Sequence, residues 1–312
     1  MHAAGTTGYR ALRERAAWID LSERGKLYAT GEDRARLLHA MTTQQVEQMH
    51  PGDGAYVFFL NAQGRILGDA NLFCLADSFL LDTEPETRRK LFEHIDRYII
   101  ADDVTLEDAS ERLATVSIEG PDAATVLEKL GAPAPEADSV ALVWGERLVA
   151  RVSATGAGGF SVILPLAQKE EFISALDAAG VPQALPDDAR TVRIEHGHPR
   201  YGEEITERYL VQETGQLHAV NFSKGCYLGQ EIVERVRSRA QIHRLLRRIE
   251  IAGTEVPAPG AKLKAGDADA GEIASAALSP ALGRVAAMAY VRTPFAEPGT
   301  ELRWDAASAR VL

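Results

Sequence analysis

Hydrophobic and polar positions between residues 55 and 82 follow the two-residue period of antiparallel strands. The apolar run 55–60 ends in the turn sequence 61–64, and residues 66–75 resume with partial alternation. Two such runs around a short turn predict a β-hairpin. Residues 79–82 predict a third short strand beside it.

Segments with helical spacing are interleaved with further strands. Apolar residues between 86 and 100 recur at the spacing of one helix face, which predicts a helix there. The same criteria predict strands at 114–121, 147–153 and 160–164, and helices at 123–130 and 168–179. Residues 155–159 are rich in glycine but lack the Gly-x-Gly-x-x-Gly pattern, so we predict a hairpin connection rather than a nucleotide loop.

The sequence pattern changes after residue 248. Short β-type segments at 248–252, 271–276 and 283–291 are separated by glycine and proline. Closely spaced short strands of this kind predict a small all-β domain at the C-terminus. The pattern therefore predicts the α+β class, with a barrel-like C-terminal domain.

Composition narrows the class of protein. The 312 residues suffice for two or three domains, and 46% hydrophobic with 25% charged residues is typical of a globular chain. No apolar stretch approaches the ~20 residues that span a bilayer, and the N-terminus lacks the regions of a secretory signal. We therefore expect a cytoplasmic protein without a membrane partner. Cys74 and Cys226 are too few for a zinc cage, and we expect no disulfide.

Charge is distributed unevenly along the chain. The net charge of −11 argues against DNA as a partner and makes RNA an unexpected one. Residues 224–248 hold seven Lys and Arg against two Glu, which is +5 and leaves −16 on the remainder. We interpret this basic segment as a site for a discrete anionic ligand; an exposed basic hairpin or strand edge is the alternative.

The segment Lys224-Gly225-Cys226-Tyr227-Leu228-Gly229-Gln230-Glu231 carries the strongest candidate chemistry. A cysteine reacts as its thiolate, and a neighbouring cation such as Lys224 favours that form. Glycines at 225 and 229 allow tight bends or close approach of a ligand. The alternative is that Cys226 is a small core residue, but its flanking residues are unlike a buried apolar run.

Two further carboxylates are candidates. Glu195 lies in the ionisable segment 193–202, where a carboxylate is able to accept two parallel N–H donors; the alternative is a glutamate at a helix end in a salt bridge. Asp69 lies in a predicted half-buried strand, where it is either a proton acceptor or a polar residue on an open face. His196 and His198 lack a third ligand, so we predict no metal site.

These motifs resemble one known family. The octapeptide 224–231 matches the Lys-Gly-Cys-Tyr-x-Gly-Gln-Glu signature of the folate-binding YgfZ-type proteins, which are relatives of the glycine-cleavage aminomethyltransferase (T-protein). Parallels also occur at 61–69, 193–197, 279–283 and 289–291. The resemblance implies two ferredoxin-like α+β units around a central channel, with a C-terminal β-barrel. Its implied domains are 1–50 with 113–242, then 51–112, then 243–312.

The resemblance also implies a ligand and its contacts. Tetrahydrofolate would fill the channel, with its pterin on Glu195 and Asp69 beside the folate amine. Tyr201 is placed among the folate-binding residues, and Arg235 and Arg237 would meet the anionic glutamyl tail. Cys226 would lie at the channel mouth, with Lys224 beside it, as the functional thiol.

The implied function is iron–sulfur cluster assembly or repair, with iron–sulfur client proteins or assembly factors as partners. The alternative is a folate-dependent aminomethyl or one-carbon transferase in which Asp69 assists proton transfer. The sequence leaves open whether the protein is an enzyme.

Gly68 stands where the aminomethyltransferase has a second aspartate, and that enzyme lacks the cysteine signature; both differences favour the YgfZ-type assignment. Ala240 replaces a glycine that often follows the signature. A third hypothesis, docking of RNA or a protein on the basic segment, is opposed by the acidic remainder.

Overall fold

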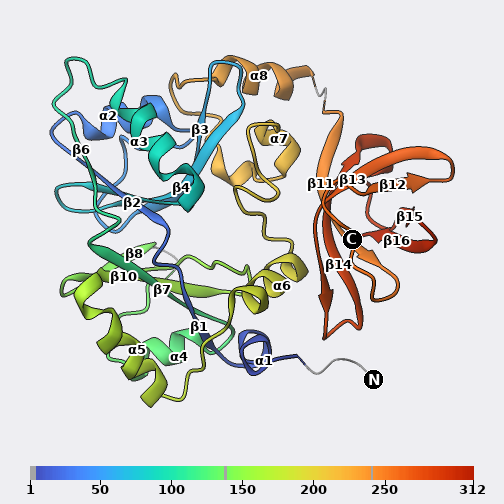
Figure 1. Ribbon diagram of the computed structural model, residues 1–312. Coiled ribbons are helices and arrows are strands. Elements are labelled where there is room, and N and C mark those ends of the chain that lie inside the picture. The colour runs from blue at the N-terminus through green and yellow to red at the C-terminus, as the bar shows by residue number, and fades with distance from the viewer. Residues whose placement is uncertain (1–4, 137–138, 240–241) are drawn as a thin grey trace.

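The computed structural model describes residues 5–136, 139–239 and 242–312, which form two helix-covered sheets and a closed β-barrel (Figure 1). The helices are α1 (Thr7–Glu14), α2 (Arg34–Met41), α3 (Arg88–Asp96), α4 (Ala123–Lys129), α5 (Lys169–Ala178), α6 (Pro186–His196), α7 (Val211–Thr214) and α8 (Gln230–Arg239). Short 3-10 turns lie at Pro85–Thr87, Leu166–Gln168, Leu217–Ala219 and Thr293–Phe295.

The first sheet has the order β1-β7-β10-β9-β8 and is antiparallel throughout. Its strands are β1 (Ala17–Asp20), β7 (Leu113–Glu119), β8 (Ala141–Trp144), β9 (Arg147–Ala150) and β10 (Gly159–Pro165). Along β7, Val116 and Ile118 pack in one core with Leu127 of α4 and Phe172 of α5. Because side chains alternate along a strand, the polar residues of β7 face the other side of the sheet.

The second sheet has the order β3-β4-β5-β2-β6. Its strands are β2 (Gly25–Thr30), β3 (Gly54–Leu60), β4 (Ile66–Cys74), β5 (Phe79–Thr83) and β6 (Thr105–Asp108). Val57 and Leu72 point to the outer face, where Leu38 of α2 and Leu91 of α3 cover them. The inner face is left to meet the first sheet.

The C-terminal strands close into a barrel in the order β11-β14-β13-β12-β15-β16. They are β11 (Arg244–Ile251), β12 (Lys262–Ala265), β13 (Ala268–Ser279), β14 (Arg284–Arg292), β15 (Glu301–Trp304) and β16 (Ala307–Val311). Closure follows because β11 pairs with both β14 and β16. Small alanines alternate with Ile, Val and Leu in its core, which suits a narrow interior.

The hairpin of β3 and β4 is present as predicted, as are β5, β7, β9 and β10 and the α+β class with its barrel. The strands β1, β2, β6 and β8 were not predicted. Two predictions are corrected. The strand β2 pairs with β5 and β6, so residues 25–30 belong to the sheet of residues 54–108, and a boundary at residue 50 cuts that unit. The second concerns the alternative given for the basic segment, an exposed hairpin or strand edge: residues 230–239 form the helix α8, and β11 has a neighbouring strand on both sides in the barrel.

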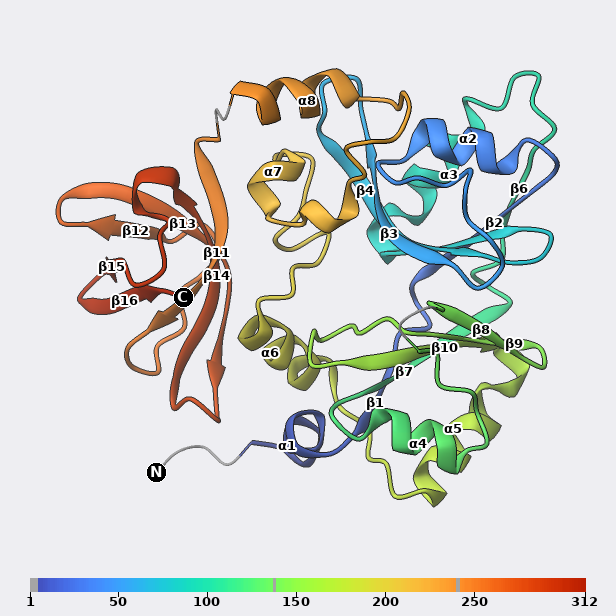
Figure 2. The same ribbon diagram turned by 180° about the vertical axis from the view of Figure 1, so that it is seen from behind.

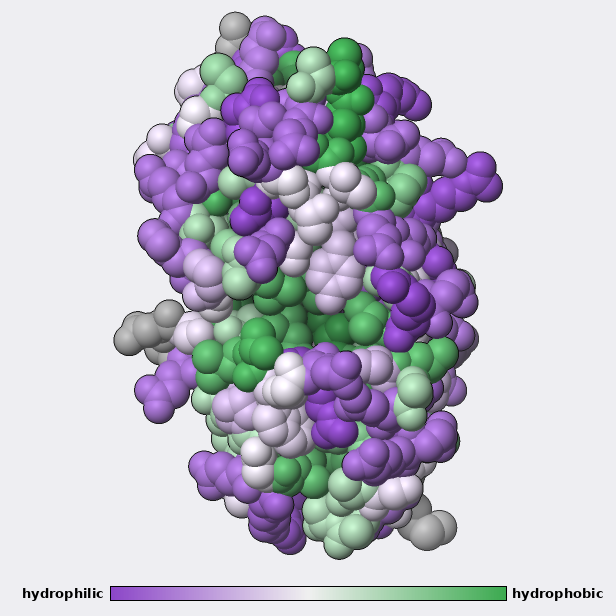
Figure 3. Space-filling model, turned by 90° about the vertical axis from the view of Figure 1, so that its left-hand side faces the viewer, coloured by the Kyte–Doolittle hydropathy of each residue, from purple (hydrophilic) through white to green (hydrophobic). Residues whose placement is uncertain are grey.

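The inner faces of the two sheets meet across the middle of the molecule. Phe73 and Leu80 of the second sheet share an apolar cluster with Leu148 and Ile163 of the first. On the face shown in Figure 3, hydrophobic side chains gather in a hollow that crosses the middle of the molecule. Figure 2 shows that α6 and α7 lie between the sheets and the barrel. The fold thus encloses a space with two sheets and one helix around it.

Candidate functional site

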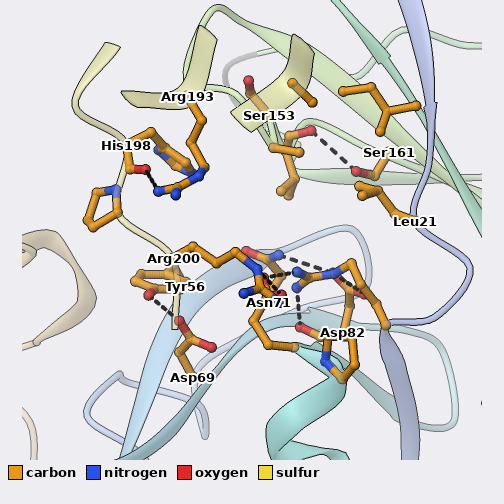
Figure 4. Close-up of a pocket in the computed structure, with 18 of the residues that line it drawn as sticks. Leu21, Tyr56, Asp69, Asn71, Asp82, Ser153, Ser161, Arg193, His198 and Arg200 are labelled. Atoms are coloured by element: carbon orange, nitrogen blue, oxygen red, sulfur yellow. Dashed lines mark hydrogen bonds and ion pairs between the residues drawn. The ribbon is translucent and has the colours of Figure 1, made fainter. Parts of the chain in front are cut away.

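A cavity of about 700 Å³ lies between the two sheets and α6. Strand alternation decides which side chains face it. Asp69, Asn71 and Phe73 of β4 line the cavity, and register places Tyr56 of β3 and Asp82 of β5 on either side of Asn71. The cavity floor is therefore a polar patch on an otherwise apolar sheet (Figure 4).

Asp69 is the most perturbed acid of this floor. Its side chain is buried, and its Oδ2 accepts a hydrogen bond of 2.6 Å from the Tyr56 hydroxyl. Burial raises the pKa of Asp69 to about 7, and the nearby charge of Glu84 adds to the rise; Tyr56 and Arg24 oppose it. Asp69 therefore exchanges a proton near neutral pH, which is the property of a general acid or base.

The neighbouring acids are held by arginines. Arg24 Nε lies 2.9 Å from both carboxylate oxygens of Asp82, and the same guanidinium pairs with Glu84. Arg200 Nε lies 2.8 Å from Glu84. Asn71 Nδ2 donates to Asp82 at 3.2 Å. Within the described residues Asp69 has no such ion pair, so among these three acids it is the one left to a ligand.

The opposite wall comes from α6 and the segment after it. Arg193 donates to the carbonyl of His198 at 2.7 Å and to Glu204 at 2.7 Å. Burial and the charge of Arg193 lower the pKa of His198 to about 4, so this imidazole is neutral at pH 7. The ring of His218 stacks on Tyr56 with centroids 5.7 Å apart. Arg193, His198 and His218 all line the cavity.

Glu195 does not line this cavity, contrary to its predicted contact with the pterin. It lies on α6 with a buried carboxylate that accepts a 2.5 Å hydrogen bond from the Tyr9 hydroxyl and pairs with Arg13. Both partners come from α1. The alternative given for Glu195, a helix-end residue in a salt bridge, describes what the structure shows.

Tyr201, Arg235 and Arg237 also lie outside the cavity lining. Tyr201 is buried in a separate core, and its hydroxyl donates to the carbonyl of Ile66 at 3.3 Å. Arg235 and Arg237 are exposed on α8, where the Arg237 guanidinium lies 4.6 Å from the ring centre of Phe222. The predicted placement of these residues around one ligand is thus corrected, because α8 lies on the far side of α7 from α6 (Figure 2).

Lys224 was predicted to lie beside the Cys226 thiol and favour its thiolate, but its side chain makes other contacts. Its Nζ donates to the carbonyls of His39, Thr42 and Gln44, the last two at 2.7 Å. These carbonyls lie in and just beyond the last turn of α2. Burial lowers the pKa of Lys224 to about 8, which still leaves the ammonium charged at pH 7. Lys224 therefore fastens the signature segment to α2.

Cys226 lies outside the central cavity, so the predicted position at its mouth is corrected. The thiol is exposed in a separate hollow of about 400 Å³ lined by Leu37 and Met41 of α2 and by Tyr98. Exposure excludes the alternative of a small core residue. The turn after it is tight: Gly229 has φ of +85°, and a Cβ there would lie 2.6 Å from the Asn61 carbonyl.

Sequence reasoning missed Tyr56, Asp82, Glu84, Arg24 and Arg200 as site residues. Strand alternation carried a signal for the first two, since both are register neighbours of Asn71, which lies on the Asp69 face. No local sequence pattern identifies Arg24 and Arg200 as site residues, because the carboxylates that they pair with come from distant segments. Within the described ranges, no group of three or more His, Cys, Asp and Glu is placed to hold a metal, and no helix there is long and apolar enough to cross a bilayer.

Comparison with known proteins agrees with this architecture. Residues 1–224 match the GCVT N-terminal domain, and residues 244–311 match the glycine cleavage T-protein C-terminal barrel domain. The chain belongs to the GCVT family. It is 30% identical to an aminomethyltransferase of Rubrobacter xylanophilus over 94% of this chain and 80% of that protein. It is 28% identical to one of Chloroherpeton thalassium over 93% and 83%, respectively.

The fold matches a solved member of the family. The crystal structure of the glycine cleavage system aminomethyltransferase T from Bartonella henselae superposes with a TM-score of 0.88 at 20% identity, covering 97% of this chain and 87% of that one. This confirms the predicted aminomethyltransferase-like fold. The predicted resemblance included both the broader group of aminomethyltransferase relatives and, within it, the YgfZ-type proteins. The GCVT family is the broader group, and the narrower YgfZ-type assignment stays a prediction.

Proposed function

We propose that this chain binds tetrahydrofolate in the cavity between its sheets and transfers a one-carbon unit, as an aminomethyltransferase-type protein. The observation that carries the proposal is Asp69, a buried acid with a pKa of about 7 that faces a cavity of about 700 Å³. The relatives named above support it, since they are called aminomethyltransferases.

The cavity fits the proposed ligand. Its volume lies in the range of about 300–1,000 Å³ typical of small-molecule pockets. Asp69 and Asn71 offer oxygen acceptors to the N–H edge of a pterin, and Leu21 and Phe73 add apolar wall. Arg151 lines the cavity, is exposed, and has no carboxylate partner in the part of the chain described, so it is available to the glutamyl tail.

The residues of the chain would bind the ligand and handle a proton. Bound tetrahydrofolate supplies the amine that carries the one-carbon unit. Asp69 holds or releases a proton close to this amine, and the Tyr56 hydroxyl fixes which oxygen of Asp69 is free. Arg24 and Arg200 keep Asp82 and Glu84 occupied, so that Asp69 is the acid left to act.

Calorimetry with tetrahydrofolate tests the proposal. We expect Asp69→Asn to weaken binding by about 1.5–3 kcal/mol, because a charge-assisted hydrogen bond is lost. Arg237→Ala, on exposed α8, is the matched control and should bind as the wild type does. Absence of binding to the wild-type protein, or equal losses in both variants, would contradict the proposal.

A second candidate function rests on Cys226. Its thiol is exposed, lies apart from the cavity, and belongs to a segment that Lys224 fastens to α2. A fixed, accessible thiol in the YgfZ-type signature supports a role in iron–sulfur cluster assembly or repair, with the folate site as a separate requirement. Client proteins or assembly factors would then meet the protein at this hollow.

Complementation of iron–sulfur enzyme activity in cells separates the two candidates. If the thiol acts, Cys226→Ser should lose complementation while its tetrahydrofolate affinity stays unchanged. If only one-carbon transfer matters, Asp69→Asn should lose turnover of an aminomethyl donor and Cys226→Ser should retain it. Full complementation by Cys226→Ser would remove the thiol from the function.

A further inference from the structure

Glu119 is a buried acid that the proposed chemistry does not use. It is the last residue of β7, and its side chain lies on the inner face of the first sheet together with Ser117. In the described part of the chain no cation pairs with it. Hydrogen bonds alone satisfy its carboxylate, and without them burial of this group would destabilise the fold.

Most of these bonds come from one short segment, 153–155. Glu119 Oε2 accepts from the hydroxyls of Ser153 at 2.6 Å and Thr155 at 2.7 Å and from the Thr155 amide at 3.3 Å. Oε1 accepts from the Ala154 amide at 2.8 Å. The remaining donor is Ser117 of the same strand, at 2.5 Å. One carboxylate thus holds three consecutive residues.

The segment held by Glu119 is a wall of the central cavity. Ser153 and Ala154 line it, and Figure 4 shows Ser153 near Ser161 on the wall opposite Asp69. The chain beyond the segment is rich in glycine, and Gly156 and Gly158 both have positive φ, a conformation that favours glycine. Gly159 must stay small, because a Cβ there would lie 2.8 Å from the Glu119 carboxyl carbon. Glu119 therefore binds the residues that enter this glycine-rich connection and packs closely against Gly159, at its far end.

We infer that Glu119 is a positioning residue that fixes the 153–155 wall and thereby sets the affinity of the cavity for its ligand. The identity of that ligand, tetrahydrofolate, rests on the proposed function. Glu119 does not line the cavity itself, so it acts through the wall and not by contact. Fixing the wall before binding spares the ligand the entropy cost of ordering it.

The hydrogen-bond donors around Glu119 indicate how strongly each variant should disturb the wall. Glu119→Ala removes the anchor altogether. Glu119→Gln keeps an oxygen for the Ala154 amide and offers an NH₂ group, to which the hydroxyls of Ser153 and Thr155 can turn as acceptors. It loses only the acceptor of the Thr155 amide, which lies 3.3 Å from Oε2. The Gln variant should therefore restore most of the wall. Thr155→Val removes one hydroxyl at constant shape and leaves Glu119 in place, and it serves if the alanine variant does not fold. Ser117→Ala is the matched control, because Ser117 binds the same carboxylate from outside the wall.

Two measurements on the full chain decide the inference: hydrogen exchange of the Ala154 and Thr155 amides, and calorimetry with tetrahydrofolate. We expect Glu119→Ala to speed exchange of both amides and to weaken binding by about tenfold, and Thr155→Val to weaken it less. Glu119→Gln should speed exchange of the Thr155 amide alone and keep most of the affinity, and Ser117→Ala should stay close to the wild type. The inference is overturned if Glu119→Ala leaves exchange unchanged, or if exchange rises while affinity holds. If the wild-type protein fails to bind tetrahydrofolate, the proposed function falls, and the exchange arm alone still decides whether Glu119 fixes the wall.

Discussion

Replacing Asp69 with asparagine is expected to lower one-carbon transfer by about 100-fold or more, the usual loss when a positioned acid or base is removed. Asparagine keeps the shape of the side chain and an oxygen for the Tyr56 hydroxyl, so the cavity floor should remain intact. What disappears is a group that titrates near neutral pH. Turnover of an aminomethyl donor on tetrahydrofolate, followed from pH 5 to pH 9, measures the loss.

The same substitution should change how stability depends on pH. The pKa of Asp69 rises from its usual 3.8 to about 7 in the folded protein, so the folded chain binds the extra proton between these values. The free energy of unfolding of the wild type should therefore fall as the pH rises from about 4 to about 7, by at most about 4 kcal/mol from this group. Asp69→Asn lacks this fall and should be the more stable protein at pH 8.

Urea unfolding at pH 4.5, 6 and 8 checks the sign. Asp77→Asn, an exposed aspartate between β4 and β5, is the control and should follow the wild-type curve. Parallel curves for the wild type and Asp69→Asn would show that burial does not perturb Asp69, and the acid–base role would fall with it.

The fold was accessible from sequence because its signals are local. The alternation at 55–60 and 66–75 and the turn between them predict the β3–β4 hairpin, and short strands after residue 248 predict the barrel. The position of β2 was not accessible. Residues 25–30 pair with β5 and β6, and Ala29 is already 50 positions from its partner Phe79 in β5, the nearer strand. The sequence near residue 25 does not indicate this pairing.

The site was predicted less well, for a related reason. Asp69 faces the cavity because strand period alone orients it. Glu195 and Lys224 look equally reactive as a sequence, yet each is satisfied by a distant partner: the Tyr9 hydroxyl for the glutamate and the α2 carbonyls for the lysine. Whether a polar side chain is available to a ligand depends on which other protein groups hydrogen-bond or ion-pair with it. A sequence motif identifies which side chain has reactive chemistry. Only the tertiary contacts decide whether that side chain is available to a ligand.

Lys224→Met is expected to lower the free energy of unfolding by about 3 kcal/mol. Methionine keeps the apolar stem but removes the N–H donors that serve the carbonyls of His39, Thr42 and Gln44. Unpaired buried carbonyls and the loss of a cation at the C-terminal end of α2 both destabilise that helix. Leu38 of α2 is fully buried in the core of the second sheet, so loosening α2 weakens that core.

This substitution also separates two roles for the lysine. Urea unfolding reports stability, and the rate of alkylation of Cys226 at pH 7 reports the reactivity of the exposed thiol. Lys129→Met, at an exposed lysine on α4, is the control and should change neither. If Lys224 fastens the segment, Lys224→Met unfolds at lower urea and the loosened segment alkylates at least as fast. If Lys224 instead activates the thiol, stability holds and alkylation slows. The three carbonyls around its Nζ favour the first outcome, because an ammonium that donates all of its hydrogens to carbonyls in and just beyond α2 has none left for the thiolate.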